Sequence, residues 1–518
     1  MASGGERARS PVPGLLTVSA PAPATKCLFV PSWPQNTTHP PQPAHHDDRI
    51  TPFGEHVDPT TIISREEDLQ GYFDLGSKPR ERWGIGLEYE RVGVFRESGQ
   101  AVPYEGEASV ETVLQTLVRD KGWTPHEEGG RLLSLDRAGS RITLEPGAQL
   151  ELSGAVHRDL AAMRDELVTY LGHVDEAARP LGIAFLGLGL QPFTPVDAIA
   201  RIPKKRYAIM NDYLPRRGSL APVMMRQTAC MQVNLDYGSE SDAADKMRTA
   251  MGLSPLATAL YANSPLTEGR LNGFMSYRAW VWRDTDPDRC GLLPFVFKDG
   301  AGFADYLEYA LDVPMFFVVR GDNWMPAHGM TFRKFVRKGF EGHRATLADF
   351  ELHLTTLFPE VRLKKYIEVR GCDSGDPGSC LALAALYKGI LYDGASRRAA
   401  WELVRDMTFK ERNALLEEVC RKGPAARVPG SRGAKGEGSA RGTALVRDLL
   451  LEIVRLARQG LNNQGAPEEA GFLDLLDRRL GGEGGCPAAR LAADWEGPLG
   501  KDPRKLVEAL SQAAVAVA

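Results

Sequence analysis

WGIGLEYERVGVF, residues 83–95, alternates between apolar and polar side chains and is rich in residues that favour β-strands. Glu88 and Glu90 lie two positions apart, so a strand places both carboxylates on one face. Leu87 and Tyr89 occupy the opposite face, which is apolar. The segment therefore predicts a strand with one face on a hydrophobic core and two negative charges on the other.

Three further strand-like segments carry polar residues at the same spacing, and few of these residues are Lys or Thr. A half-exposed antiparallel sheet with a solvated polar face would explain any one of them. Four faces rich in carboxylates and carboxamides favour another arrangement, in which they converge inside a cupped sheet. The segments are AQLELSG (148–154) with Gln149 and Glu151, MQVNLDY (231–237) with Gln232, Asn234 and Asp236, and YIEVRG (366–371) with Tyr366, Glu368 and Arg370.

Carboxylates gathered inside a sheet need a compensating positive charge, because unpaired anions are costly to desolvate. Mg²⁺ prefers carboxylate and carboxamide oxygens and commonly joins protein carboxylates to nucleotide phosphates. Zinc is disfavoured, since no Cys or His occupies these positions. Arg370 shares a face with Glu368, and its planar guanidinium suits phosphoryl oxygens. The four strands therefore predict a site for Mg²⁺ and phosphate.

A second polar cluster is SYRAWVWRDTDPDR, residues 276–289. It offers Arg278 and Arg289 to a substrate carboxylate and Trp282 as an apolar wall. A surface loop with local salt bridges is the alternative interpretation. The chain has neither a Walker A motif nor a kinase-type glycine loop, so nucleotide binding would need another scaffold.

The order of elements predicts an α+β fold with a helical C-terminal third. Capping boxes are expected at 64–67 and 408–411, where each would start a helix. Strands are expected within 131–152 as a hairpin and at 181–193, and one more strand is expected within 358–371. Helices are expected at 158–178, 242–262, 381–393, 399–421, 443–461, 468–480 and 502–515.

Composition points to small-molecule partners. The 518 residues are 43% hydrophobic with a net charge of −4, which favours neither nucleic acid nor an anionic membrane as a partner. No apolar run approaches the roughly 18–20 residues that span a bilayer. The seven cysteines form no CxxC pair, so neither a disulfide framework nor a zinc site is expected. We expect a cytoplasmic protein that is a monomer or a weak homodimer.

The domain organisation is expected to be simple. Residues 1–47 are rich in Pro, Ala and Ser, which predicts a disordered tail, with an organelle transit peptide as the alternative. Residues 48–518 are expected to form a single catalytic domain. The basic, Gly-rich stretch 423–442 is expected to be a flexible surface loop.

A set of motifs in this sequence resembles the plant and proteobacterial type of glutamate–cysteine ligase, in the glutamine synthetase-like carboxylate–amine ligases. The resemblance runs from about residue 60 to 500, with the motifs in order and nearly at the family spacing. They are GIGLEYERVGVF, ITLEPGAQLELSG, QVNLDY, ANSPLTEGRLNGF, DTDPDRCGLLPFVF, YALDVPMFF, GMTFRKF, HLTTLFPEVRLKKYIEVRG and EAGFLDLLDR.

The resemblance implies a cupped antiparallel sheet whose concave face holds the active site, with ATP and Mg²⁺ as cofactors. It implies that Glu88, Glu90 and Arg370 are catalytic. By the same resemblance, the Mg²⁺ ligands are Glu88, Glu90, Glu151, Gln232 and Glu368; the nucleotide-phosphate contacts are Asn234 and Arg370; Arg278 binds glutamate; and Tyr207, Met210 and Trp282 lie near the substrates.

The implied reaction phosphorylates the γ-carboxylate of glutamate with ATP, and the amine of cysteine then displaces phosphate, which is the first step of glutathione synthesis. The alternatives are a γ-glutamyl ligase with another amine acceptor or one serving ergothioneine synthesis, and a non-catalytic regulator that binds nucleotide or glutamate. The sequence departs from the family at Gln227, where many relatives have arginine. It also lacks the plant disulfide switch, because the position that should pair with Cys380 is Arg164.

Overall fold

The computed structural model describes residues 58, 60–429, 444–482 and 485–515. Its largest feature is a nine-stranded antiparallel sheet in the order β14-β15-β7-β1-β5-β4-β3-β2, with β6 paired to the far end of β1. The strands are β1 Ile85–Phe95, β2 Thr124–Glu128, β3 Arg131–Arg137, β4 Ser140–Leu144, β5 Leu150–Ser153, β6 Ile183–Leu186, β7 Cys230–Leu235, β14 Val361–Leu363 and β15 Ile367–Asp373.

The register of the central strands places the polar residues in adjacent rows. β1 lies between β5 and β7, so its two glutamates have polar neighbours on both sides. The polar faces predicted from the sequence therefore become one continuous surface. The paired positions are Glu88 with Gln232 and Ser153, Glu90 with Glu151, Glu151 with Thr143, and Glu368 with Asn234 and Arg362.

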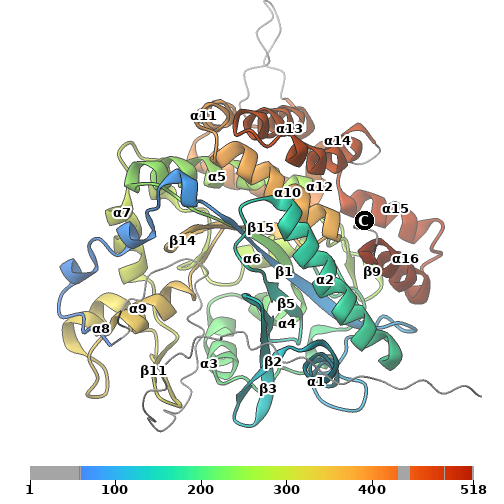
Figure 1. The fold of residues 1–518 in the computed structure, drawn as a ribbon, viewed down its shortest axis with the longest axis horizontal. Coiled ribbons are helices and arrows are strands. Elements are labelled where there is room, and N and C mark those ends of the chain that lie inside the picture. The colour runs from blue at the N-terminus through green and yellow to red at the C-terminus, as the bar shows by residue number, and fades with distance from the viewer. Residues whose placement is uncertain (1–57, 59, 430–443, 483–484, 516–518) are drawn as a thin grey trace, which may run out of the picture. The chain divides into compact units, whose positions relative to one another are not determined.

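The opposite, apolar face of the sheet packs against long helices. α10 (Pro377–Leu391) contacts β1 and β7, α5 (Glu240–Leu260) contacts β14 and β15, and α2 (Leu160–Ala178) lies beside α10 (Figure 1). Every residue of α10 except Gly378 is buried, which explains its nearly unbroken apolar sequence. The alternate residues of the strands, among them Leu87, Tyr89, Val233, Leu235, Ile367 and Val369, are buried in this core.

The predicted α+β class and helical C-terminal third are confirmed, and further helices extend the layer behind α10 and α5 (Figure 1). The single helix expected at 399–421 is wrong, because the chain breaks at 403–408. The expected capping box starts the second piece: Glu411 N–H donates to Thr408 Oγ1 (3.2 Å), and Thr408 N–H donates to Glu411 Oε2 (2.8 Å). The helices are α11 Gly394–Glu402, α12 Phe409–Lys422, α13 Val446–Asn463, α14 Asp474–Gly481, α15 Pro487–Glu496 and α16 Pro503–Val515.

Three other local expectations are corrected. The box expected at 64–67 is wrong: the segment forms only a 3-10 turn, Glu66–Leu69, preceded by Arg65, and Asp68 rather than Glu67 accepts from the Ser64 N–H (2.8 Å). The strand expected at 181–193 is only β6, because the chain turns away after Leu186. The segment 358–371 forms three short strands, β13 (Phe358–Pro359), β14 and β15, because a tight turn at 364–366 folds β14 back onto β15.

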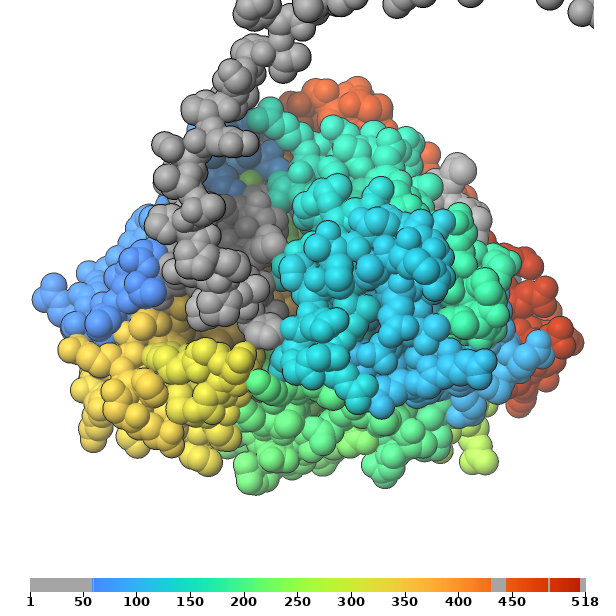
Figure 2. All heavy atoms as spheres, turned by 60° about the horizontal axis from the view of Figure 1, so that its bottom comes forward, coloured from blue at the N-terminus to red at the C-terminus, as the bar shows by residue number. Residues whose placement is uncertain are grey.

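Shorter elements surround the polar face of the sheet. Figure 2 shows this side of the molecule, with residues of β2 and β3 in cyan on one side and those of α8 and α9 in yellow on the other. The other short helices and strands of the described chain are α1 Val110–Lys121, α3 Lys205–Tyr213, α4 Ala221–Gln227, α6 Tyr277–Arg283, α7 Phe303–Asp312, α8 Phe332–Lys338, α9 Leu347–Leu354, β8 Leu266–Thr267, β9 Arg270–Leu271, β10 Cys290–Gly291, β11 Phe317–Arg320 and β12 Asn323–Pro326.

The predicted tail and the predicted surface loop lie wholly or partly beyond the residues that the structure describes. The tail 1–47 and residues 430–442 of the expected loop lie outside the described residues. Just before them, Gly423–Ala425 forms a 3-10 turn, and Ala426 and Val428 are buried. In the part of the chain that the structure describes, no helix is long and apolar enough to cross a membrane.

Candidate active site

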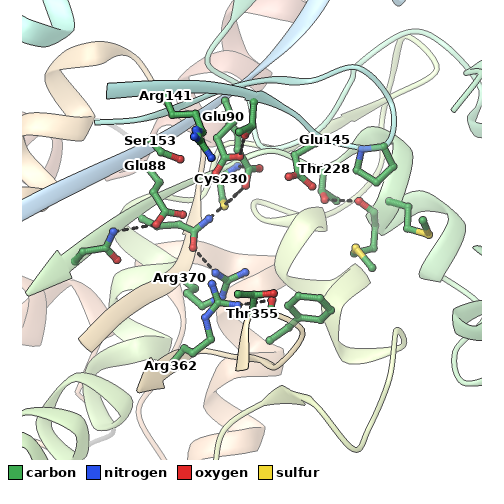
Figure 3. Close-up of a pocket in the computed structure, with 18 of the residues that line it drawn as sticks. Glu88, Glu90, Arg141, Glu145, Ser153, Thr228, Cys230, Thr355, Arg362 and Arg370 are labelled. Carbon is green, nitrogen blue, oxygen red and sulfur yellow. Dashed lines mark hydrogen bonds between the residues drawn. The ribbon is translucent and has the colours of Figure 1, made fainter. Parts of the chain in front are cut away.

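A cavity of about 250 Å³ opens on the polar face of the sheet. Figure 3 shows Glu88, Glu90 and Glu145 on one side of it and Arg362 and Arg370 on the other. Its floor is formed by β1, β5, β7 and β15, because every second residue of these strands points to this face. The predicted site residues that line it are Glu88, Glu90, Glu151, Tyr207, Met210, Gln232, Asn234, Arg278, Trp282 and Arg370.

Burial and crowding make the negative charges of three carboxylates costly. Burial, followed by the nearby carboxylates Glu368 and Glu151, raises the pKa of Glu88 to about 7. Burial together with Glu145 and Glu151 raises the pKa of Glu90 to about 8. Burial and Glu145 raise the pKa of Glu151 to about 7. A cation in the cavity would relieve this cost.

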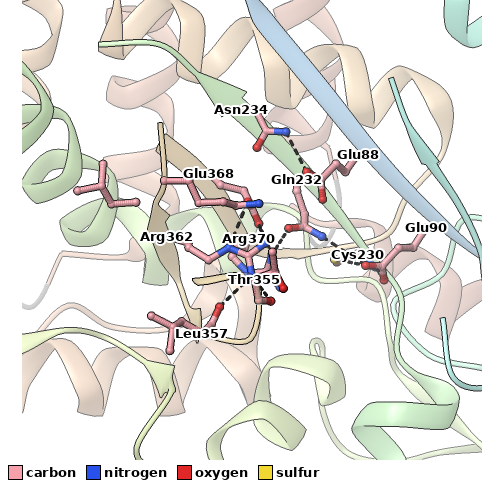
Figure 4. Close-up of polar contacts among 12 residues, drawn as sticks. Glu88, Glu90, Cys230, Gln232, Asn234, Thr355, Leu357, Arg362, Glu368 and Arg370 are labelled. Carbon is pink, nitrogen blue, oxygen red and sulfur yellow. Dashed lines mark hydrogen bonds and ion pairs between the residues drawn. The ribbon is translucent and has the colours of Figure 1, made fainter. Parts of the chain in front are cut away.

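Residues of the neighbouring strand β7 hold Glu88 and Glu90 in place (Figure 4). Asn234 Nδ2 donates to Glu88 Oε1 at 2.9 Å, while the buried Oδ1 of Asn234 has no hydrogen-bond partner among the described residues. Glu90 accepts from Gln232 Nε2 (3.3 Å) and from the backbone N–H of Cys230 (2.8 Å). Side-chain contacts across β1 and β7 therefore fix the position of both glutamates.

Glu368 differs from the other predicted residues, because it does not line the cavity and its charge is already neutralised. Its carboxylate accepts two hydrogen bonds from Arg362 (2.6 and 3.2 Å), lies 3.1 Å from Lys364 Nζ and accepts from Arg370 Nη1. Burial opposes its ionisation, but these cations outweigh burial and hold the pKa of Glu368 well below its usual range. Arg370 also donates to Gln232 Oε1, so Glu368 and Gln232 together aim its guanidinium at the cavity.

The donor chemistry around the cavity fits Mg²⁺ in part. As the side chains stand, no three His, Cys, Asp or Glu residues within the described ranges converge closely enough to hold an ion. Glu88, Glu90 and Glu151 nevertheless line one cavity, offer only oxygen as a ligand atom and form no ion pair with any described residue, which suits a hard divalent ion. Gln232 and Glu368 fit less well, because both already accept hydrogen bonds from Arg370.

Arg278 and Trp282 come from α6, whose start is fixed by Asp373. Ser276 Oγ, the N-cap of α6, and Ser264 Oγ both donate to Asp373 (2.7 and 2.6 Å). Arg278 is 4% exposed and donates to the backbone carbonyl of Arg370 at 3.2 Å. Arg278 Nε and Trp282 Nε1 are buried without a hydrogen-bond partner in the described chain. Both groups can therefore donate to a substrate without breaking an existing bond.

The other two predicted substrate contacts belong to α3. Tyr207 OH donates to the backbone carbonyl of Leu144 (3.0 Å) and lies 3.3 Å from Glu145 Oε1. Met210 lies one turn further along the same helix face. These side chains form an apolar wall beside the carboxylates.

Three polar residues singled out in the sequence are structural. Arg289 is fully buried, pairs with Asp286 at 2.6 Å and donates to two backbone carbonyls, so its expected contact with a substrate carboxylate is wrong. Gln149 donates to the Thr228 carbonyl (2.8 Å). Asp236 pairs with Lys78 (2.8 Å).

Several cavity residues were not predicted, although they show the same spacing of two positions along a strand. Arg141 and Thr143 alternate along β4, and Arg362 and Lys364 lie two apart around β14. Their spacing could have revealed them, but a strand mixing Arg and Thr resembles an ordinary solvated face.

A cavity with buried carboxylates on one side and Arg362 and Arg370 on the other, on the polar face of an antiparallel sheet, is typical of an enzyme that binds several anionic groups together. A family model described as glutamate–cysteine ligase family 2 (GCS2) matches residues 84–508. The chain belongs to this family.

Relatives and solved structures agree. The chloroplastic glutamate–cysteine ligase B of Oryza sativa subsp. japonica is 40% identical over 448 residues, which cover 86% of each chain. The chloroplastic enzyme of Arabidopsis thaliana is 38% identical over 462 residues, covering 89% of this chain and 85% of its own. The crystal structure of Francisella tularensis glutamate–cysteine ligase in complex with AMP has a TM-score of 0.51 at 12% identity, covering 84% of this chain and 89% of that chain, and shares the fold.

These comparisons confirm the resemblance, the fold class and the ligase class predicted from the sequence. The predicted cytoplasmic location is wrong: the relatives from rice, tobacco and Arabidopsis are named chloroplastic, which points to an organelle. That prediction rested on scattered cysteines without a CxxC pair and on the interpretation of residues 1–47 as a disordered tail, and neither feature distinguishes the two compartments.

Proposed function

We propose that this chain joins the γ-carboxylate of glutamate to the amine of cysteine, consuming ATP and giving γ-glutamylcysteine, ADP and phosphate. This is the first step of glutathione biosynthesis. One observation carries the proposal: a chain 40% identical to a glutamate–cysteine ligase places Glu88 and Glu90 opposite Arg362 and Arg370 in a single cavity.

A carboxylate is a poor acyl donor, because oxide would have to leave. In the first step, a γ-carboxylate oxygen of glutamate attacks the γ-phosphorus of ATP, the bond to the bridging oxygen breaks, and ADP leaves. In the second step, the cysteine nitrogen attacks the γ-carbon, the bond from that carbon to the phosphate oxygen breaks, phosphate leaves, and the nitrogen loses a proton. The protein supplies positioning and charge neutralisation.

Glu88, Glu90 and Glu151 are the residues that would hold Mg²⁺, which when bound neutralises phosphate charge. Gln232 and Glu368, also expected as ligands, would instead orient Arg370. Arg370 and Asn234 would contact the nucleotide phosphates, since the guanidinium fork matches phosphoryl oxygens. Without Mg²⁺ the same three carboxylates would repel a phosphate group, so phosphate binding would depend on the bound ion.

Arg278 would bind the α-carboxylate of glutamate through its unpartnered Nε, with Trp282, Tyr207 and Met210 beside the substrates. The substrates are small molecules, and the chain would act as a monomer or a weak homodimer, which light scattering measures directly.

Release of ADP from ATP and Mg²⁺ with glutamate, with and without each candidate amine, tests the function. We expect rapid ADP release only with cysteine, matched by γ-glutamylcysteine formation. Equal or faster release with another amine would refute cysteine as the acceptor, and ATP consumption without glutamate would refute the reaction.

A further inference from the structure

A second cavity of about 280 Å³ lies on the other side of β1 from the catalytic cavity. It is bounded by α2, by β6 and by Ser511 of α16, elements that pack against one another (Figure 1). Its walls are mainly apolar and include Val168, Leu171, Val174 and Phe185.

Arg91 is the unusual member of this lining. It follows Glu90 in β1, so its side chain points away from the catalytic face. Although it is 3% exposed, its buried Nε and Nη2 atoms have no hydrogen-bond partner among the described residues. A buried guanidinium left without partners is costly.

Aromatic rings compensate only part of this cost. The Arg91 Cζ atom lies 5.0 Å from the ring centroid of Tyr170, 5.5 Å from that of Tyr89 and 5.7 Å from that of Phe185. Ring faces attract the charge but accept no strong hydrogen bonds. The donors on the edge of the guanidinium therefore stay unsatisfied.

The acidic residues beside the cavity are already engaged. Asp175 pairs with Arg96 at 3.2 Å and with Arg179 at 2.6 Å. Glu176 pairs with Lys121. The charge of Arg91 is thus unmatched by any carboxylate of the described chain, and the buried hydroxyl of Ser511, which also lines the cavity, lacks a hydrogen-bond partner among the described residues.

We infer that this cavity is a second ligand site, which binds a small aliphatic monocarboxylate through Arg91. The planar carboxylate matches the guanidinium fork with two parallel hydrogen bonds. One unmatched positive charge calls for one negative charge, and the apolar walls favour an aliphatic body over inorganic phosphate.

Sodium 3-methylbutanoate is a suitable probe, with 3-methylbutanamide as its neutral isostere and inorganic phosphate as a bare anion. We expect saturable one-site binding by calorimetry and a rise in Tm of about 1–3 °C at ten times Kd. The amide and phosphate should bind at least tenfold more weakly. Equal binding of the amide would overturn recognition by charge, and tighter binding of phosphate would overturn the aliphatic specificity.

Two variants separate this site from the catalytic cavity, where Arg278 could also attract a carboxylate. Arg91→Met removes the charge and keeps the length. Gly172→Leu adds a side chain to the wall of the cavity, since Gly172 lines it and a Cβ at this exposed helical position of α2 meets no atom within 4 Å. We expect both to lose the calorimetric signal and the Tm shift, with wild-type turnover in Gly172→Leu.

Arg490→Met is the matched control, since the Arg490 side chain is 85% exposed and lies on α15. It should bind the probe like wild type. Binding that survives in Gly172→Leu would overturn the proposal even if Arg91→Met failed to fold. Absence of saturable binding to the wild type would show that the cavity holds only water.

Discussion

At the scale of single residues, Arg370 shows how the site is built. Its guanidinium is held by Glu368 and Gln232 from two different strands, and its backbone N–H donates to the Glu360 carbonyl at 3.0 Å. We expect Arg370→Lys to lower kcat by about 10²-fold or more, because lysine keeps the charge but not the fork. Steady-state kinetics with all three substrates measure this. A near wild-type kcat would mean that Arg370 serves only to neutralise Glu368.

The carboxylates give a second prediction. Glu88→Gln and Glu151→Gln should each lower turnover by about 10²-fold or more, since the charge that would hold Mg²⁺ is lost while the shape remains. Without metal at pH 8, the Tm of both variants should equal or exceed that of wild type. The reason is that their raised pKa values make ionisation destabilising above the unfolded value of 4.5.

The exposed Glu97 supplies the control for these variants. Its side chain is 75% exposed and pairs only at the surface, with Arg504, so Glu97→Gln should leave turnover unchanged. Unaltered Mg²⁺ dependence in Glu88→Gln would remove Glu88 from the set of ion ligands.

His353 predicts how stability depends on pH. It is 4% exposed, lies 2.8 Å from the Ala310 carbonyl oxygen and stacks on Phe332, and burial lowers its pKa to about 3. Below about pH 6.5 the unfolded chain therefore binds a proton at His353, whereas His353 of the folded chain stays neutral. Relative to His353→Gln, wild type should lose about 1.4 kcal/mol of unfolding free energy per pH unit as pH falls from 6 to 4. Parallel curves for the two proteins in urea titrations would contradict this.

Residue patterns predicted which side chains share a face, but not which partners they choose. Period-two spacing was enough to bring Glu88, Glu90 and Glu151 to one cavity. The spacing could not show that Arg362 neutralises Glu368. That pairing depends on a turn at 364–366, and only one strand was expected within 358–371. Arg289 was misassigned for a similar reason, since its partners lie up to 67 positions away.

At the scale of elements, α10 and α13 cross at two glycines with their backbones in close contact. A Cβ added to Gly460 would lie 1.9 Å from the Gly389 carbonyl oxygen, so the two backbones touch. We expect Gly460→Ala to cost about 3 kcal/mol or more of unfolding free energy, because one helix must move. Denaturant unfolding measures this loss.

Gly172→Ala on α2 is the matched control, since its new methyl group has open space. It should stabilise the protein by about 0.4–1 kcal/mol by restricting the unfolded chain. Equal effects of the two substitutions would show that the crossing is not tight.

Element boundaries were the least accurate part of the sequence analysis. The long, strongly patterned helices at 158–178 and 242–262 agree with α2 and α5 within two residues at each end. The helix expected at 399–421 instead breaks in two, and the capping box at 408–411 already marked where the second piece begins.

At the scale of the whole molecule, we expect activity to be independent of redox state. The described cysteines are all free, and five of the six are buried, among them Cys372 and Cys380. Burial raises the pKa of both thiols well above the usual range, so reactive thiolate is scarce. Arg164, where the family disulfide would need a cysteine, pairs with Asp165 at 2.9 Å.

Equal activity in dithiothreitol and in mild oxidant is the expected result. Free thiols should not decline after gentle oxidation. A reversible, several-fold loss of activity under reduction that Cys380→Ser abolishes would overturn this prediction.

The order of the strands has a consequence for how the chain acquires activity during its synthesis. β1 is synthesised early, yet its neighbour β7 follows about 140 positions later. β15 comes later still, and the supporting helix α10 ends only at Leu391. Contacts so distant in sequence give a high contact order, which slows folding and leaves early strands without their partners. A nascent chain shorter than about 390 residues thus exposes the apolar face of β1 and has no complete catalytic cavity, so this enzyme should depend on chaperones until most of its length has been made.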